Sequence, residues 1–216
     1  PTCGCAENER ILKNKTITGF WHGLDLHQIT TDKVPALGGD RQQGKTANFA
    51  LVYMASAARM HYEVPSLSRR QWQDIIDQFF ELYYGVKSWH LRMERGLYES
   101  GVCTDIFGRK RRMLPKEIKK NPKHALNQFV NFSPQSSACG LIELAMTKIR
   151  QECIDMGTWI DEIVQVGMVH DECVFEINEN VIDRYTPIII KHLENAVQLR
   201  VPVRTSMKIA DNWSKT

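Results

Sequence analysis

The sequence predicts an α+β protein, in which helices pack against a small, mostly antiparallel sheet. Three observations support this class. Helical periodicity dominates most of the first hundred residues, and short β-like segments around Gly108 then interrupt it. Near the C-terminal end, two apolar runs meet at an acidic turn, as in a β-hairpin.

Four helical segments are expected in the N-terminal half. Pro35 and the pair Gly38–Gly39 close the second of them, Pro65 follows the third, and Gly85 is expected to interrupt the fourth. The four segments are Glu9–His22, Asp25–Val34, Asp40–Met60 and Ser68–Tyr98.

The remainder mixes strands and helices. Gly101–Leu114 contains β-like pieces with Gly108 at their turn, and helix returns from about His124. The pattern then predicts a long buried helix, two strands, a final helix and a last strand. Their expected ranges are Gln135–Met156, Ile160–Val169, Cys173–Ile177, Val181–Gln198 and Val201–Ile209.

Positive charge is concentrated in one place. The 216 residues include 28 basic and 25 acidic side chains, for a net charge of +3. The stretch 108–123 holds eight of the basic residues and one acid, and the chain without it has a net charge of −4. Such a patch favours a polyanionic partner, although a solvated basic loop explains it equally well.

Composition excludes several classes. The chain is 43% hydrophobic and 25% charged, which is ordinary for a globular protein. No apolar run approaches the ~18 residues of a membrane span, and the N-terminal residues do not form a signal peptide. Six scattered cysteines are typical of reduced intracellular thiols, so a cytoplasmic location is expected.

One helical segment combines cations with aromatic rings. Arg41, Lys45, Phe49 and Tyr53 follow one another at intervals of four residues, so they share one broad helix face. Cations can hold a phosphate chain, and a ring offers a flat surface for a base or sugar. Spacing alone favours the alternative, in which the aromatic pair faces the core and the basic residues are exposed.

The second group of polar residues is His170–Asp171–Glu172, in the expected turn between two strands. Carboxylates in a tight turn can bind Mg²⁺, which prefers oxygen ligands. Adjacent strand residues point to opposite faces, so Asp171 and Glu172 are not expected to contribute equally. An acidic turn without a ligand is the more common case.

Six motifs cover the chain from Asp25 to Trp213. In chain order they are DLHQITTDKV, RQQGKTANFALVY, IFGRKRRMLP, NFSPQSSA, MVHDECVFEI and IADNW. Taken together, and in this order, they resemble family A DNA polymerases, the class of bacterial polymerase I and many phage replicases. Ala50 and Met54 stand where the family usually has glycines, and Asn127 stands where it often has arginine.

The resemblance implies a role for each matching residue. His27, Arg41 and Lys45 would hold the triphosphate of the incoming nucleotide. Phe49 would stack near its sugar and base, with Tyr53 beside the templating position. Asp171 and Glu172 would bind catalytic Mg²⁺, and Lys45 is counted with them as catalytic. The residues expected to contact primer-template DNA are Arg109, Lys110, Arg111, Arg112, Asn131, Gln135 and His170.

The resemblance also implies a polymerase "right hand" without its thumb and first palm strand. Residues 25–100 would form the fingers and 101–216 the palm, after an entry remnant in 1–24. Two Mg²⁺ ions need a second aspartate, which we expect on an upstream polypeptide that also carries the thumb. The expected source is a phage or a bacterium, and the chain would be a split or fragment polymerase.

Two other functions remain open at this point. The chain could be a catalytically silent nucleic-acid-binding module derived from a polymerase. A Mg²⁺-dependent nuclease is the weaker alternative, because it would need more clustered carboxylates than Asp171 and Glu172.

Overall fold

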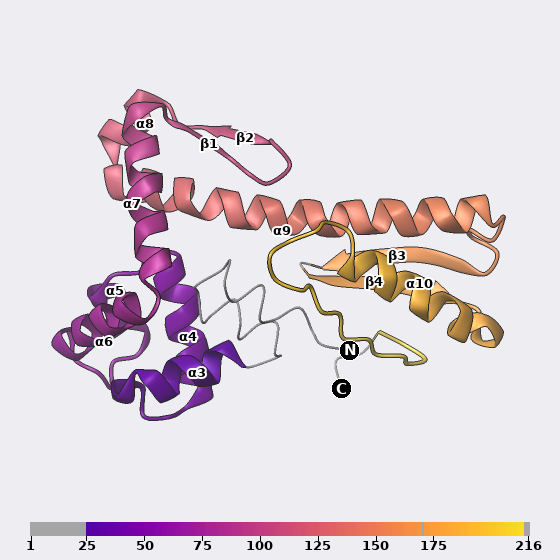
Figure 1. Ribbon diagram of the computed structural model, residues 1–216, viewed down its shortest axis with the longest axis horizontal. Helices are drawn as coiled ribbons and strands as arrows, with labels where there is room; N and C mark the ends of the chain where they lie inside the picture. Colours follow the sequence, from indigo (N-terminus) through magenta and orange to yellow (C-terminus); the bar gives the residue numbers. More distant parts are fainter. Residues whose placement is uncertain (1–24, 170, 214–216) are drawn as a thin grey trace. The chain divides into compact units, whose positions relative to one another are not determined.

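The computed structural model describes residues 25–169 and 171–213, which divide into two compact units at Pro134 and Gln135. It combines helices with two antiparallel hairpins, so the predicted α+β class is confirmed (Figure 1). The expected helix Glu9–His22, the entry remnant 1–24 and His170 lie outside the described residues. The boundary expected between the fingers (25–100) and the palm (101–216) stays a prediction.

The first unit is mainly helical (Figure 1). Its elements are α3 (Leu26–Lys33), the 3-10 turn η1 (Pro35–Leu37), α4 (Arg41–Val52), α5 (Ala57–Glu63), α6 (Arg69–Leu82), α7 (Tyr84–Glu99), β1 (Val102–Thr104), β2 (Lys110–Arg112) and α8 (Pro115–Lys120). The start of α9 (Pro122–Asp155) also belongs to this unit.

Local sequence accounts for the ends of α3 and α4. Asp25 caps α3 by accepting hydrogen bonds from two backbone N–H groups, and Asp40 caps α4 through the N–H of Gln42. Between the helices, Gly38 has a φ of +66°, a left-handed conformation that glycine adopts at little cost. The predicted Asp25–Val34 element is therefore confirmed.

The single helix expected over Asp40–Met60 is wrong. The chain leaves α4 at Tyr53, and Met54 has a φ of +63°, where a left-handed conformation replaces the helical one. Ser56 then caps α5 by accepting from the N–H of Arg59. The side-chain pattern continues through this turn, so periodicity did not reveal the break.

Helices α3 to α6 enclose an apolar core. Its largest fully buried members include Trp72, Phe79, Leu51 and Met60. Ser68 and Gln71 form a capping box at the start of α6. The predicted helical region Ser68–Tyr98 is confirmed, but its interruption falls at Tyr83 rather than at Gly85.

A second core lies beneath the first hairpin. β1 pairs antiparallel with β2, and Gly108 in the connecting turn has a φ of +83°, as the sequence predicts. Cys103 from β1 and Met113 pack with Phe129 and Val130 of α9. This packing attaches the hairpin to α9.

The second unit contains the rest of α9, β3 (Ile163–Val169), β4 (Glu172–Ile177), η2 (Glu179–Val181) and α10 (Ile182–Glu194). β3 and β4 pair antiparallel, with an irregularity between Gln165 and Gly167. Ile149 and Cys153 of α9 pack with Ile163, Tyr185 and Ile189, so α9, the hairpin and α10 share one core (Figure 1). The predicted hairpin and final helix are confirmed.

Two expectations for this unit are wrong. The segment Gln135–Met156 is helical as far as Asp155, as predicted, but it is not a buried helix, since many of its side chains are exposed. Val201–Ile209 does not form a strand, because no described segment pairs with it. Within the described ranges, no helix has both the length and the apolar character required to cross a bilayer.

Candidate active site

The first candidate site is built where α3 crosses α4. Gly44 makes the close approach possible: a Cβ added at this position would lie only 2.2 Å from the carbonyl oxygen of His27 and 3.3 Å from Cβ of Thr31. Any larger residue would separate the helices. His27 is therefore held against the helix that carries Arg41, Lys45 and Phe49.

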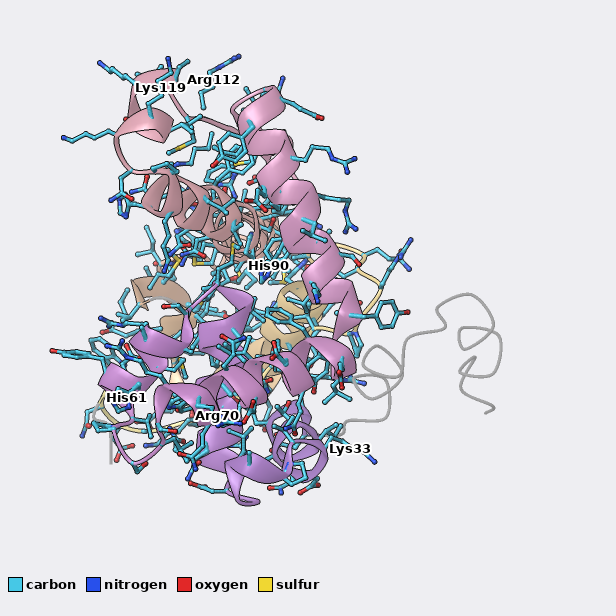
Figure 2. All side chains as sticks on the ribbon, turned by 90° about the vertical axis from the view of Figure 1, so that its left-hand side faces the viewer. Lys33, His61, Arg70, His90, Arg112 and Lys119 are labelled. Atoms are coloured by element: carbon cyan, nitrogen blue, oxygen red, sulfur yellow. The ribbon has the colours of Figure 1, made fainter. Side chains whose placement is uncertain are left out.

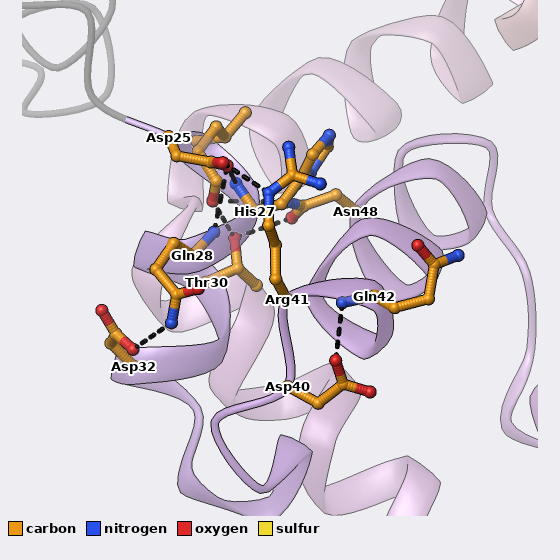
Figure 3. Close-up of polar contacts among 10 residues, drawn as sticks. Asp25, His27, Gln28, Thr30, Asp32, Asp40, Arg41, Gln42 and Asn48 are labelled. Carbon is orange, nitrogen blue, oxygen red and sulfur yellow. Dashed lines mark hydrogen bonds and ion pairs between the residues drawn. The ribbon is translucent and has the colours of Figure 1, made fainter.

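Asp25 joins the first turns of the two helices. One oxygen accepts from the backbone N–H groups of His27 and Gln28, at 2.9 and 3.2 Å, and the other accepts from Nε of Arg41 at 2.5 Å (Figure 3). The hydrogen bond from Arg41 is the main reason that the pKa of Asp25 is lowered. The carboxylate thus stays ionised and orients the guanidinium of Arg41.

Behind His27 runs a chain of buried polar groups. Asn48 Nδ2 lies 2.9 Å from His27 Nδ1, Asn48 Oδ1 accepts from the Thr30 hydroxyl at 2.9 Å, and Thr30 lies 2.7 Å from the Tyr83 hydroxyl. Burial, followed by the charges of Arg41 and Lys45, lowers the pKa of His27 against the opposing effect of Asp25. His27 is therefore favoured in its neutral form.

A cleft of about 710 Å³ lies along the exposed face of α4 and is bounded by α5 and α9. Lys45, Phe49 and Tyr53 all line it, as their spacing predicts, whereas Arg41 does not. Phe49 is 53% exposed, so the interpretation that this ring belongs to the core is wrong. The His27 and Phe49 ring centroids lie 5.8 Å apart.

Asn131 of α9 lines the same cleft. Its Oδ1 is buried and accepts no hydrogen bond from the described part of the chain. A buried acceptor of this kind is stabilised when a ligand or a water molecule donates a hydrogen bond to it. The arrangement can therefore hold phosphates through cations, stack an aromatic ligand and satisfy one buried acceptor.

The basic hairpin is the second candidate surface. Asp105, only 7% exposed, accepts from the backbone N–H of Arg109 at 2.8 Å and from its Nε at 2.6 Å. Arg111 donates to Gln128 at 2.9 Å, while Lys110 and Arg112 are exposed. Figure 2 shows Arg112 and Lys119 at the same end of this unit. The basic patch is thus exposed and partly pre-ordered.

In the second unit, Asp171 and Glu172 are exposed at the turn between β3 and β4. Glu172 Oε1 accepts from the indole N–H of Trp213 at 3.0 Å. Two carboxylates of this kind suit Mg²⁺ as oxygen ligands. Among the residues that the structure describes, no third histidine, cysteine or acid joins them in a cluster that could hold a metal.

The sequence-predicted residues that the structure describes lie in three places. Those around α4 in the first unit are His27, Arg41, Lys45, Phe49, Tyr53 and Asn131. The basic hairpin of the same unit carries Arg109, Lys110, Arg111 and Arg112, whereas Gln135, Asp171 and Glu172 belong to the second unit. Sequence reasoning missed Asn48, Thr30 and Asp105 as residues that orient the others. The signal was available for Asn48 and Thr30, because both lie within quoted motifs, but their contacts span 18 or more positions.

The family follows from comparison with known proteins. Residues 12–215 match DNA polymerase family A. This match covers nearly the whole chain, and the chain belongs to that family.

Curated relatives include the DNA polymerase I of Rhizobium leguminosarum, 30% identical over 209 residues that cover 91% of this chain and 20% of the relative. The DNA polymerase I of Caldicellulosiruptor bescii is 29% identical over 223 residues, covering 98% of this chain and 25% of the relative. The chain therefore spans about a fifth to a quarter of the length of these relatives.

Among solved structures, the chain is similar to the POL domain of Pol1 from M. smegmatis, in complex with DNA primer-template and dNTP. The TM-score is 0.76 at 24% sequence identity, and the match covers 87% of this chain and 34% of that one. The likeness shows a shared fold and agrees with the predicted α+β class.

Proposed function

We propose that this chain is the fingers-and-palm part of a DNA-directed DNA polymerase, which transfers a nucleotide from a dNTP to a primer 3′-hydroxyl. The observation that carries the proposal is the face of α4, where Lys45, Phe49 and Tyr53 line one cleft beside His27. Family membership supports it, as does the relative whose structure was solved with primer-template and dNTP.

In this proposal the triphosphate lies against the first half of α4. Arg41 and Lys45 supply positive charge, and neutral His27 donates a hydrogen bond to a phosphate oxygen. Phe49 presents an exposed ring to the sugar and base, and Tyr53 closes the helix beside the templating position. Residues 25–100 would then act as fingers and 101–216 as palm.

The primer-template would follow the basic hairpin. Arg109, Lys110, Arg111 and Arg112 contact its backbone in this proposal, with Asn131, Gln135 and His170 nearer the primer end. Contacts of this kind give sequence-independent, salt-sensitive affinity. We expect a cytoplasmic location, in a bacterium or a phage-infected cell.

Asp171 and Glu172 would hold Mg²⁺ in this proposal, and an aspartate on an upstream polypeptide would complete the site. When bound, the metal ions stabilise the attacking and leaving oxygens of the transfer. Trp213 restrains one oxygen of Glu172, which leaves Asp171 as the main ligand. The chain's own residues hold the nucleotide so that the 3′-hydroxyl can attack its α-phosphate, with pyrophosphate leaving.

Primer extension tests the nucleotide site. We expect the 216-residue chain to incorporate dNTPs only when an upstream polypeptide with a catalytic aspartate is added. In that complex, Lys45→Ala should lower kcat/KM by roughly 10²-fold, the order seen when a transition-state donor is removed. Lys33→Ala is the matched control, because this exposed lysine lies outside the cleft. Equal loss in both variants would contradict the assignment.

Metal chemistry separates a polymerase from a silent DNA-binding module. Asp171→Ala should abolish incorporation by the completed enzyme while primer-template affinity is retained. Asp161→Ala removes an exposed carboxylate elsewhere in the same unit and should leave the rate unchanged. DNA binding without incorporation by the completed wild-type enzyme would favour the silent module, and robust incorporation by the chain alone would refute the need for an upstream aspartate.

A further inference from the structure

The imidazole of His27 is held from one side. Its Nδ1 lies 2.9 Å from Nδ2 of Asn48, which projects from the facing helix (Figure 3). A neutral imidazole carries its hydrogen on one nitrogen only, and the partner of one nitrogen decides whether the other is a donor. The orientation of the Asn48 amide therefore determines what His27 can present at Nε2.

The surroundings of Asn48 determine that orientation. Its Oδ1 accepts from the Thr30 hydroxyl at 2.9 Å, and its Nδ2 lies 3.5 Å from the carbonyl oxygen of Leu26. Exchanging the two amide atoms would put an oxygen against that carbonyl and remove one of the two acceptors that lie near the Thr30 hydroxyl. The Nδ2 group therefore faces His27 and donates to it.

Tyr83 supports Thr30 from the core. The Thr30 hydroxyl lies near two acceptors, Leu26 O at 2.8 Å and Asn48 Oδ1, so its single hydrogen points toward them. The Tyr83 hydroxyl, 2.7 Å away, must then be the donor to Thr30. Burial raises the pKa of Tyr83, which keeps that hydrogen in place.

We propose that Asn48 is a positioning residue for His27, and that its amide keeps Nδ1 free of a proton so that the neutral ring donates only through Nε2. An imidazolium would bring an Nδ1–H against the Asn48 N–H, two donors facing each other. The use of this donor rests on the proposed function, in which Nε2–H meets a triphosphate. The state of the ring itself does not depend on it.

The charges near His27 agree with a neutral ring. Asp25 at the start of α3 raises the pKa of His27, but Arg41 and Lys45 on α4 lower it, and burial lowers it most. The nearby Phe49 ring, whose centroid lies 5.8 Å from that of His27, is uncharged. A neutral donor can bind phosphate oxygens without exchanging a proton near neutral pH.

Nitrogen-15 NMR of the His27 ring tests the proposal on the chain without nucleotide. We expect the Nε2–H tautomer in the wild type. Asn48→Asp should favour the imidazolium and raise the pKa of His27 by about 1 unit or more, as a facing carboxylate does. An Nδ1–H tautomer in the wild type, or an unchanged pKa in Asn48→Asp, would overturn the proposal.

Thr30→Val provides a test that introduces no buried charge. It removes the hydroxyl that orients Asn48, so the two tautomers should become more equally populated. Thr31→Val is the matched control, because both threonines are buried on α3 but the Thr31 hydroxyl faces Leu37 O. Tyr83→Phe should shift the tautomers in the same direction as Thr30→Val. Equal tautomer ratios in Thr30→Val and Thr31→Val would contradict the role of Asn48.

Titration with dATP separates this proposal from the proposed function. If both hold, Thr30→Val weakens dATP binding by about tenfold, the loss expected for a hydrogen bond to a charged group. An Nε2–H tautomer that shifts in Thr30→Val with unchanged dATP affinity supports positioning by Asn48. The same result overturns the triphosphate role of His27.

Discussion

Gly44→Ala is the sharpest perturbation of the packing that holds His27. The new Cβ would lie 2.2 Å from His27 O, 3.2 Å from His27 C and 3.3 Å from Thr31 Cβ. The first contact is with backbone, which cannot rotate away, so α3 and α4 must separate by about 1 Å to restore van der Waals distances. The shift also disturbs the hydrogen bond between Thr30 and Asn48.

The net change in the free energy of unfolding combines two contributions that lower it and one that raises it. Overpacking a close contact costs about 1–3 kcal/mol, and a strained hydrogen bond costs about 1 kcal/mol. Alanine regains about 1 kcal/mol over glycine within a helix. We therefore expect a loss of about 2 kcal/mol in the free energy of unfolding, or a fall in Tm of about 4–8 °C for a chain of this size.

Thermal and urea unfolding, followed by tryptophan fluorescence, would measure this loss. Gly85→Ala is the matched control, because Gly85 lies in α7 and a Cβ there meets no atom within 4 Å. That variant should gain about 0.5–1 kcal/mol from helix propensity. If Gly44→Ala is as stable as Gly85→Ala, the close contact between α3 and α4 is refuted.

Three further predictions concern other parts of the chain. Replacing both Arg112 and Lys119 by alanine should weaken primer-template binding and reduce the magnitude of the slope of log K against log salt concentration by about 2. Fluorescence anisotropy at several salt concentrations would measure this slope. An unchanged slope would show that these cations face solvent. The pKa of Glu152 is lowered by hydrogen bonds from His192 and Lys191, so its contribution to stability is present above pH 4.5 and lost as pH falls below that value. The Tm difference between wild type and Glu152→Gln should therefore shrink on acidification. A Tm difference that stays constant with pH would contradict this. Ile160 has a φ of +81° and is 70% exposed, so Ile160→Gly should relieve strain and raise the free energy of unfolding by about 1 kcal/mol, whereas a lower Tm would refute the strain.

Much of the local structure could be predicted from the sequence because short-range chemistry determines it. Asp25 and Asp40 are helix caps, Gly38 and Gly108 allow left-handed turns, and α6 shows its apolar face by periodicity. The same local spacing placed Lys45, Phe49 and Tyr53 on one helix face, which the cleft confirms. Their catalytic and binding roles stay proposals.

Long-range packing decided the rest. The chain turns at Met54 without glycine or proline, although the family often has glycine there, and the strand expected at Val201–Ile209 has no described partner. Such features depend on contacts between residues that are distant in sequence, and the local hydrophobic periodicity does not reveal those contacts.

The polar contacts around His27 divide in the same way. The sequence by itself determined which helix carries the cations and rings, because a four-residue interval acts within one helix. Only the tertiary structure decided that Gly44 lets α3 approach and that Asn48, Thr30 and Tyr83 stand behind His27. A buried polar group needs a hydrogen-bond partner wherever the fold places one. For Thr30, one such partner is Tyr83, which lies 53 residues further along the chain.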